Sequence, residues 1–279
     1  MRIAVLGTGV MGPGVAQVAA QAGHQVCLWN RRQASVERGR AAVEQSLGRL
    51  VKKEKLSAAE AASALARISP TSVLEDVKDA ELVIEAVAED LQVKRELYER
   101  LAGLCAPGTV LATNTSSLSV TKLASYSGRP EQFIGLHFFN PVPAMQLVEI
   151  VRGLATSDAT AAFASDFARQ LGKEPIPARD MPGFVVNRVL MPMMNEAARA
   201  LEQGVASPEQ IDACMKLGCN HPMGPLALAD LVGLDVVAAI LDSLHAEFGQ
   251  SHYRTCMEIR RRVESGWLGR KTGRGFYTY

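Results

Sequence analysis

The sequence predicts an α/β protein in which a doubly wound, mostly parallel sheet with a helical hairpin insertion is followed by a smaller all-α domain. Apolar strand-like runs alternate with helical runs through the first two thirds of the chain, which is typical of such sheets. From Pro182-Gly183 onward the runs are helical, with almost no β-branched alternation between them. We therefore expect one domain over residues 1–182 and a second over residues 183–279.

The first element is an apolar strand, Arg2 to Leu6, that runs into a Gly-x-Gly-x-x-Gly motif, a helix and a second strand, Gln25 to Trp29. The first glycine permits a tight turn, the second lets the backbone approach a pyrophosphate, and the third lets the helix pack closely on the strand. A diphosphate at the helix N-terminus meets unpaired N–H groups and a favourable helix dipole. This pattern predicts a Rossmann-type dinucleotide site. The residues of the motif expected at the cofactor are Gly7, Gly9, Val10, Met11 and Gly12.

A long helix from Val36 to Lys53 and a second from Ala58 to Ala66, capped by Ser57, form an excursion longer than a standard crossover. We therefore expect a protruding helical hairpin. Further strands are expected over 82–85, 110–113, 133–137 and 147–151, with a helix over 93–104. In the second domain, helices are expected over 184–201, 207–216, 226–244 and 253–263.

Composition excludes several classes of protein. A hydrophobic content of 48% with 21% charged residues is ordinary for a globular enzyme. The net charge of +1 argues against nucleic acid or membrane lipid as the main partner. No apolar run approaches the roughly 20 residues that span a bilayer, and the first strand begins at once, so we expect no signal peptide and a cytoplasmic protein. Cys214 and Cys219 lack a second pair at zinc spacing, so we expect reduced thiols and no metal.

Polar residues that follow or interrupt apolar strands are the candidates for chemistry, because α/β sheets bind ligands at the carboxyl ends of their strands. The polar run 113–117 suits ligand contact, and its alternative is an N-cap for a helix near Val120. His137 ends an apolar strand, where it is a candidate base at neutral pH. Glu149 lies within an apolar strand and needs a cationic or imidazole partner unless it faces solvent. Asn187 lies among apolar neighbours that favour an inward face over a surface amide.

Six motifs carry a resemblance to a known family. They are the Gly-x-Gly-x-x-Gly motif and the segments 114–118 (Asn-Thr-Ser-Ser-Leu), 137–141 (His-Phe-Phe-Asn-Pro), 182–188 (Pro-Gly-Phe-Val-Val-Asn-Arg), 222–225 (Pro-Met-Gly-Pro) and 269–277. With these motifs in this order, the chain resembles the 3-hydroxyacyl-CoA dehydrogenases, in particular the compact 3-hydroxybutyryl-CoA dehydrogenases. The resemblance covers essentially the whole chain.

The resemblance implies hydride transfer with NAD(P) between (3S)-3-hydroxyacyl-CoA and 3-ketoacyl-CoA of short chain length. It implies that His137 is the general acid/base, held by Glu149, with Ser116 and Asn187 completing the site. Further cofactor contacts are implied for Glu89, Lys94, Asn114, Ser116, Asn140 and Lys271, and acyl-CoA contacts for Ser46, Lys53, Ser116 and Asn187. For Glu89 and Lys94 the alternative is a solvated helix N-terminus. Apolar faces of the helical domain favour a homodimer.

The chain departs from the family pattern after the second strand, where Asn30 replaces the usual acidic residue and Arg31 and Arg32 follow. Loss of the negative charge removes repulsion of a 2′-phosphate, and an arginine offers it a partner, which favours NADP over NAD. The alternative is that Asn30 still accepts the ribose hydroxyl while the arginines are solvated.

Two other functions are compatible with this domain order. One is a β-hydroxyacid dehydrogenase that acts on a free acid, although such enzymes use a lysine of the helical domain where this chain offers Asn187 and Arg188. The other is a non-catalytic, crystallin-like protein that keeps the cofactor-binding fold.

Overall fold

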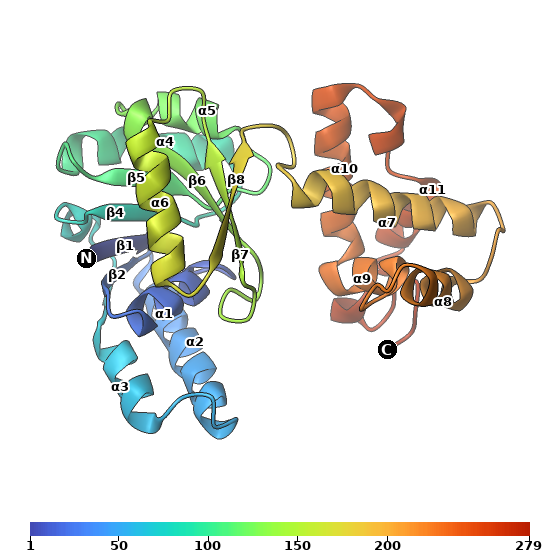
Figure 1. The fold of residues 1–279 in the computed structure, drawn as a ribbon, viewed down its shortest axis with the longest axis horizontal. Coiled ribbons are helices and arrows are strands. Elements are labelled where there is room, and N and C mark those ends of the chain that lie inside the picture. Colours follow the sequence, from blue (N-terminus) through green and yellow to red (C-terminus); the bar gives the residue numbers. More distant parts are fainter. The chain divides into compact units, whose positions relative to one another are not determined.

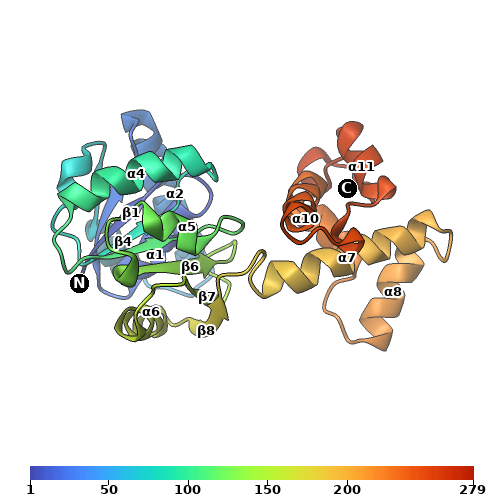
Figure 2. The same ribbon diagram turned by 90° about the horizontal axis from the view of Figure 1, so that it is seen from above.

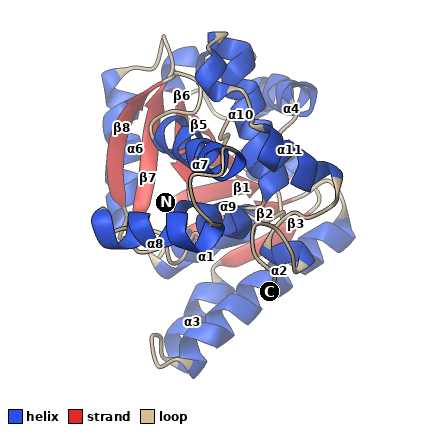
Figure 3. Ribbon diagram, turned by 90° about the vertical axis from the view of Figure 1, so that its right-hand side faces the viewer, coloured by secondary structure: helices blue, strands red, loops and turns tan.

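The computed structural model describes residues 1–279 and divides into two compact units, Met1–Met181 and Pro182–Tyr279. The division lies one residue before the expected boundary. All eight strands of the sheet belong to the first unit, and the second is built of helices (Figure 3). None of the helices combines the length and apolar character that crossing a bilayer requires.

The first unit is built on an eight-stranded sheet in the order β3-β2-β1-β4-β5-β6-β7-β8 (Figure 1). Neighbouring strands are parallel except for β6 and β7, which are antiparallel. The chain moves from β1 outward first to one side and then to the other, so the strand order reverses beside β1, where such sheets bind ligands. The strands are β1 (Arg2–Leu6), β2 (Gln25–Trp29), β3 (Ile68–Thr71), β4 (Leu82–Glu85), β5 (Val110–Thr113), β6 (Phe133–Phe138), β7 (Leu147–Arg152) and β8 (Glu174–Arg179).

Helices cover both faces of the sheet, and Figure 2 shows α4 on one side and α6 on the other. Apolar side chains of α1, α2 and α6 form one buried core with alternate residues of the strands. The expected hairpin is present, because α2 and α3 pack together and α3 starts with a capping box between Ser57 and Glu60. The helices are α1 (Gly12–Gln21), α2 (Gln33–Lys52), α3 (Ala58–Ala66), α4 (Leu91–Leu104), α5 (Val120–Ser125) and α6 (Asp158–Gln170).

Three elements of this unit were not expected from the sequence. β3 contains Pro70 and β8 contains Pro175 and Pro177, and both strands lie at the edges of the sheet. Proline lacks the N–H that a central strand must donate, so it argues against a strand in a sequence while remaining compatible with an edge. Helix α6 does carry a recognisable start, since Ser157 caps it by accepting the Thr160 N–H.

The second unit contains α7 (Val186–Glu202), α8 (Pro208–Gly218), α9 (Pro225–Val232), α10 (Leu234–Phe248) and α11 (Met257–Glu264). The expected single helix over 226–244 is wrong. The chain breaks at Gly233, whose φ is 104°, and the Leu234 N–H donates to Leu268 O instead of to a carbonyl of α9. The helix expected from residue 253 begins only at Met257, after a 3-10 turn at Ser251–Tyr253.

Two buried aspartates hold the C-terminal segment against this helical unit. Asp230 accepts the backbone N–H groups of Phe276 and Tyr277, each at 2.9 Å. Asp212 accepts the Tyr277 hydroxyl at 2.8 Å and the first N–H groups of α9. A Cβ at Gly275 would lie 2.0 Å from an Asp230 carboxylate oxygen, so only glycine fits there. The closing glycine-rich motif is therefore a structural clasp.

Candidate functional site

The glycine-rich turn between β1 and α1 has the geometry that its sequence predicts. Gly7 has φ 115°, and a Cβ there would lie 2.2 Å from Ala86 O. A Cβ at Gly12 would lie 1.8 Å from Gly7 O, so this glycine lets the turn close. At Gly9 a Cβ would meet nothing within 4 Å, so its backbone borders open space. Val10 beside it is 77% exposed, and Met11 precedes the first residue of α1.

Asn30 is committed to interactions within the protein. Its Oδ1 accepts the Arg32 N–H at 3.1 Å, which leaves Nδ2 to donate to Thr8 Oγ1 at 3.0 Å. Because a backbone N–H can only donate, the amide orientation is fixed. Thr8 is pressed in turn against α2, since a Cβ at Gly39 would lie 2.7 Å from Thr8 Cβ. Arg31 and Arg32 are exposed beside this arrangement.

His137 and Glu149 face each other across the only antiparallel pair of the sheet. They are register partners in β6 and β7, and His137 Nδ1 lies 2.6 Å from Glu149 Oε2. Their side chains are 7% and 1% exposed, so the alternative of a solvent-facing Glu149 is wrong and the expected imidazole partner is confirmed. With the carboxylate accepting from Nδ1–H, Nε2 is the ring nitrogen that can exchange a proton with a ligand.

Ser116 lies in a turn after β5 that we call the Ser116 loop (residues 115–117). One carboxylate oxygen of Glu89 accepts the N–H groups of Ser116 and Ser117 at 3.0 and 3.2 Å. The same oxygen accepts the Ser117 hydroxyl at 3.0 Å and also the Thr115 hydroxyl. The expected alternative role of this segment as an N-cap is wrong, because Ser119 caps α5.

Lys94 forms an ion pair with Glu89. Its side chain is 1% exposed, so the alternative of a solvated position at a helix N-terminus is wrong for Lys94. Its ammonium lies 2.9 Å from Glu89 Oε2 and 2.9 and 3.0 Å from the two oxygens of Glu85. Partial burial opposes ionisation of Glu89, but the Lys94 charge and the Thr115 hydrogen bond outweigh it and lower the Glu89 pKa to about 2.

Asn114 and Asn140 lie at the carboxyl ends of β5 and β6. The side-chain oxygen of Asn114 accepts the Phe138 N–H at 2.9 Å, which ties the two strand ends together. Asn140 is exposed and precedes a cis peptide bond to Pro141. The following loop is held by Lys173, whose Nζ donates to Val142 O and Met145 O, each at 2.7 Å.

The remaining expected site residues lie on α2 and in the second unit. Ser46 is half-buried on α2, and the exposed Lys53 caps its C-terminus. Asn187, in the first turn of α7, is 7% exposed, so the surface-amide alternative is wrong. Lys271 pairs with Asp235 at 2.5 and 2.7 Å.

Sequence reasoning missed three polar residues that hold the site together: Glu85, Tyr98 and Asp180. Glu85 is fully buried and accepts five hydrogen bonds, two of them from Lys94 and the others from Val87 N, Tyr98 and Thr113. Asp180 accepts the first N–H groups of α5 and the Ser119 hydroxyl. Glu85 could have been found from the sequence, because it is a polar residue at the end of an apolar strand, as His137 is.

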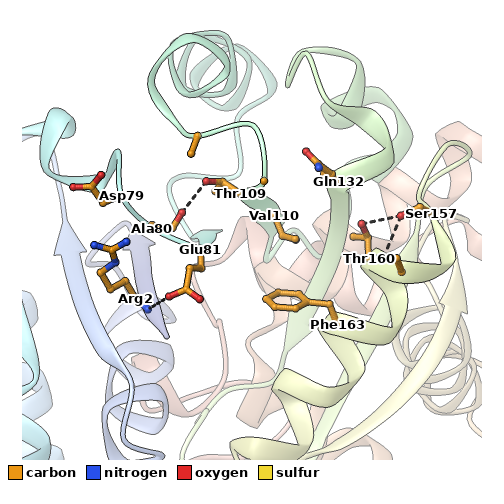
Figure 4. A pocket seen from close by; sticks show the side chains of 13 residues that line it. Arg2, Asp79, Ala80, Glu81, Thr109, Val110, Gln132, Ser157, Thr160 and Phe163 are labelled. Atoms are coloured by element: carbon orange, nitrogen blue, oxygen red, sulfur yellow. Dashed lines mark hydrogen bonds between the residues drawn. The ribbon is translucent and has the colours of Figure 1, made fainter.

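A cavity of about 580 Å³ opens at the amino ends of the strands, whereas the candidate site lies at their carboxyl ends (Figure 4). It is lined by residues at the amino ends of the strands, among them Arg2, Glu81 and Thr109, and by the start of α6. None of the expected site residues lines it, so this cavity is separate from the site of His137.

Comparison with known proteins assigns the chain to a family. Residues 2–181 match the family described as 3-hydroxyacyl-CoA dehydrogenase, NAD binding domain, and residues 183–279 match its C-terminal domain. A probable 3-hydroxybutyryl-CoA dehydrogenase of Deinococcus radiodurans is 50% identical over 100% of both chains. The 3-hydroxybutyryl-CoA dehydrogenase of Clostridioides difficile is 48% identical over 100% of this chain and 99% of its own.

Among solved structures, the (S)-3-hydroxybutyryl-CoA dehydrogenase of Ralstonia eutropha superposes with a TM-score of 0.96 at 50% identity. The match covers 100% of this chain and 98% of that one. Both domains and their order are thus shared with these dehydrogenases, and the predicted resemblance is confirmed. The chain is an NAD-binding oxidoreductase of the 3-hydroxyacyl-CoA dehydrogenase family.

Proposed function

We propose that this enzyme interconverts (3S)-3-hydroxybutyryl-CoA and acetoacetyl-CoA, with His137 as the general acid/base. The observation that carries the proposal is the buried contact of 2.6 Å between His137 Nδ1 and Glu149 at the carboxyl end of β6. The names of the relatives, which cover the whole chain, support the short acyl group. The glycine-rich turn of the first unit is the proposed place of the cofactor pyrophosphate.

The protein supplies proton transfer, while the nicotinamide supplies the hydride chemistry when bound. In the oxidation direction His137 Nε2 takes the proton of the substrate 3-hydroxyl. Glu149 accepts Nδ1–H, fixes the tautomer and stabilises the imidazolium that forms. Ser116 holds the substrate oxygen and fixes its distance from the cofactor, and Asn187 stays a further proposed substrate contact.

The test is His137→Gln. We expect turnover of acetoacetyl-CoA to fall by about 10³-fold or more, because general acid–base catalysis contributes roughly 10²–10⁴-fold. Cofactor affinity should stay within a factor of about three, as tryptophan or NAD(P)H fluorescence reports. Weakened cofactor binding with preserved turnover at saturation would refute the role of His137. Free acetoacetate serves as the second substrate, and faster reduction of it than of the thioester would favour a hydroxyacid dehydrogenase.

For the cofactor we propose a preference for NADP over NAD. Asn30 has no negative charge to repel a 2′-phosphate, its amide is already held by Thr8 and Arg32 N–H, and Arg31 is exposed next to it. Asn30→Asp should shift the ratio of catalytic efficiencies toward NADH by about 10-fold or more, since a carboxylate accepts ribose hydroxyls and repels phosphate. A wild-type enzyme that prefers NADH would contradict the proposal.

We also propose a cytoplasmic homodimer formed through the second unit. The five cysteines are free, as is usual in a reducing compartment. Large apolar side chains of the second unit are exposed in the single chain, including Val189 at 67% and Leu231 at 50%. Light scattering on the purified protein should give twice the chain mass of 30.0 kDa, and a monomer at micromolar concentration would rule the dimer out.

A further inference from the structure

The carboxyl end of β4 is joined to the Ser116 loop by a buried chain of charges. Glu85 is 0% and Lys94 1% exposed, whereas Glu89 at the outer end is 36% exposed. Two carboxylates therefore share one ammonium, and the inner carboxylate is held by the backbone and by two hydroxyls. A buried arrangement of this kind has little freedom, because moving any member leaves a charge without its partner.

We propose that Glu85 and Lys94 are positioning residues for the Ser116 loop: the buried pair fixes Glu89, and Glu89 gathers the backbone and hydroxyl groups of the loop. An ammonium has three N–H donors. Those of Lys94 meet two oxygens of Glu85 and one of Glu89, each within 3.0 Å. The three donors of Lys94 are thus occupied by Glu85 and Glu89, which supports action through Glu89 in place of the direct cofactor contact that the family resemblance implies.

The contacts of Glu89 explain how this pair reaches the reaction. Its Oε2 faces Lys94, while its Oε1 accepts the N–H groups of both serines of the loop. Without Lys94, Glu89 Oε2 loses its charged partner, and the carboxylate is held only through the hydrogen bonds of the loop to Oε1. The loop then no longer holds Ser116 in one place. The consequence for turnover rests on the function proposed above, whereas the consequence for the loop does not.

Two variants disrupt the buried Glu85–Lys94 pair without substituting any residue of the Ser116 loop. Glu85→Gln keeps the shape of the side chain and retains Lys94 and Glu89, but it turns an amide N–H₂ toward groups that donate. The double change Glu85→Gln with Lys94→Met removes both buried charges together and so avoids the unpaired charge that Lys94→Met alone would bury. The matched control is the pair Arg95→Met with Glu99→Gln, which also removes one positive and one negative charge, at an exposed ion pair of α4 (49% and 48% exposed).

The first readout is amide hydrogen exchange of residues 114–119 in the protein without ligand. We expect the Ser116 and Ser117 amides to exchange about 10-fold faster in the double variant and measurably faster in Glu85→Gln, as the loss of a charged hydrogen bond implies. The control should match the wild type. Exchange needs no turnover, so this result stands even if the wild type fails to reduce acetoacetyl-CoA, an outcome that would contradict the proposed function alone.

The second readout is the pH dependence of kcat/KM for acetoacetyl-CoA. The charged and titratable groups around Glu89 are Lys94, Glu85 and Tyr98. In the double variant the Lys94 ammonium no longer lowers the Glu89 pKa, so this pKa rises from its wild-type value while the hydrogen bonds from Thr115 and Ser116 persist. The acidic limb of the pH profile should therefore lie at higher pH than in the wild type and the control. A double variant of near wild-type melting temperature whose loop exchange, kcat/KM and pH profile all equal the wild type would overturn the proposal.

Discussion

Glu149→Gln tests how much the buried carboxylate contributes to proton transfer. The substitution keeps the shape of the side chain and an oxygen that can accept His137 Nδ1–H, so the tautomer is retained and only the charge is lost. Glu149 is 1% exposed, so solvent screens its charge little. A hydrogen bond to a charged group contributes about 1.5–3 kcal/mol, and each 1.4 kcal/mol is about tenfold in rate. We therefore expect kcat/KM to fall by about 10- to 150-fold.

The assay is the initial rate of acetoacetyl-CoA reduction followed by the absorbance of the reduced cofactor. Cofactor dissociation constants by fluorescence should be unchanged, since Glu149 lies behind the imidazole and not at the glycine-rich turn. Glu174→Gln, an exposed change on β8, is the matched control. A Glu149→Gln enzyme within about threefold of the wild type would show that orientation alone suffices and that the anionic charge is not needed.

Three further outcomes follow from contacts elsewhere in the fold. Gly39→Ala should weaken cofactor binding by about 10-fold in a fluorescence titration, because the new Cβ would lie 2.7 Å from Thr8. Gly48→Ala is the control in the same helix. Its Cβ meets nothing within 4 Å, so it should stabilise α2 by up to about 1 kcal/mol. Asp230→Ala should lower the free energy of urea unfolding by about 3 kcal/mol or more, because it leaves buried N–H groups without acceptors; an unchanged midpoint would contradict the clasp. Because the Glu89 pKa is about 2 in the folded protein and about 4.3 in the unfolded chain, ionised Glu89 stabilises the fold above about pH 5. This stabilisation disappears as the pH falls from about 5 to 2. The melting temperature of Glu89→Gln should therefore fall less than that of the wild type between about pH 7 and pH 3.

The central strands could be predicted from the sequence, and the edges could not. β1, β2, β4 and β5 have the bounds that their apolar runs predict, because strands buried on both faces leave a continuous apolar signal. The edge strands β3 and β8 contain proline and pack less apolar surface, so their signal is lost among loops. The break at Gly233 was missed because one glycine in an apolar helical run costs only about 1 kcal/mol, and what ends α9 is a contact with Leu268, far away in the sequence.

The candidate site could be predicted where a single residue type in its local sequence indicated a role. A lone carboxylate in an apolar strand required a partner, and that reasoning identified Glu149 before the register with His137 was known. The network around Glu89 was not predictable, because it depends on the distance between the end of β4, the second turn of α4 and the loop after β5. The spacing of residues along the chain does not predict which side chains of three separate elements come into contact.

The antiparallel register of β6 and β7 has a consequence for how such enzymes diversify. Since the imidazole and its carboxylate belong to neighbouring strands of a single sheet, backbone pairing brings them together without any contribution from the helical unit. Residues 182–279 can therefore be exchanged or redesigned without altering the backbone pairing that sets His137 beside Glu149.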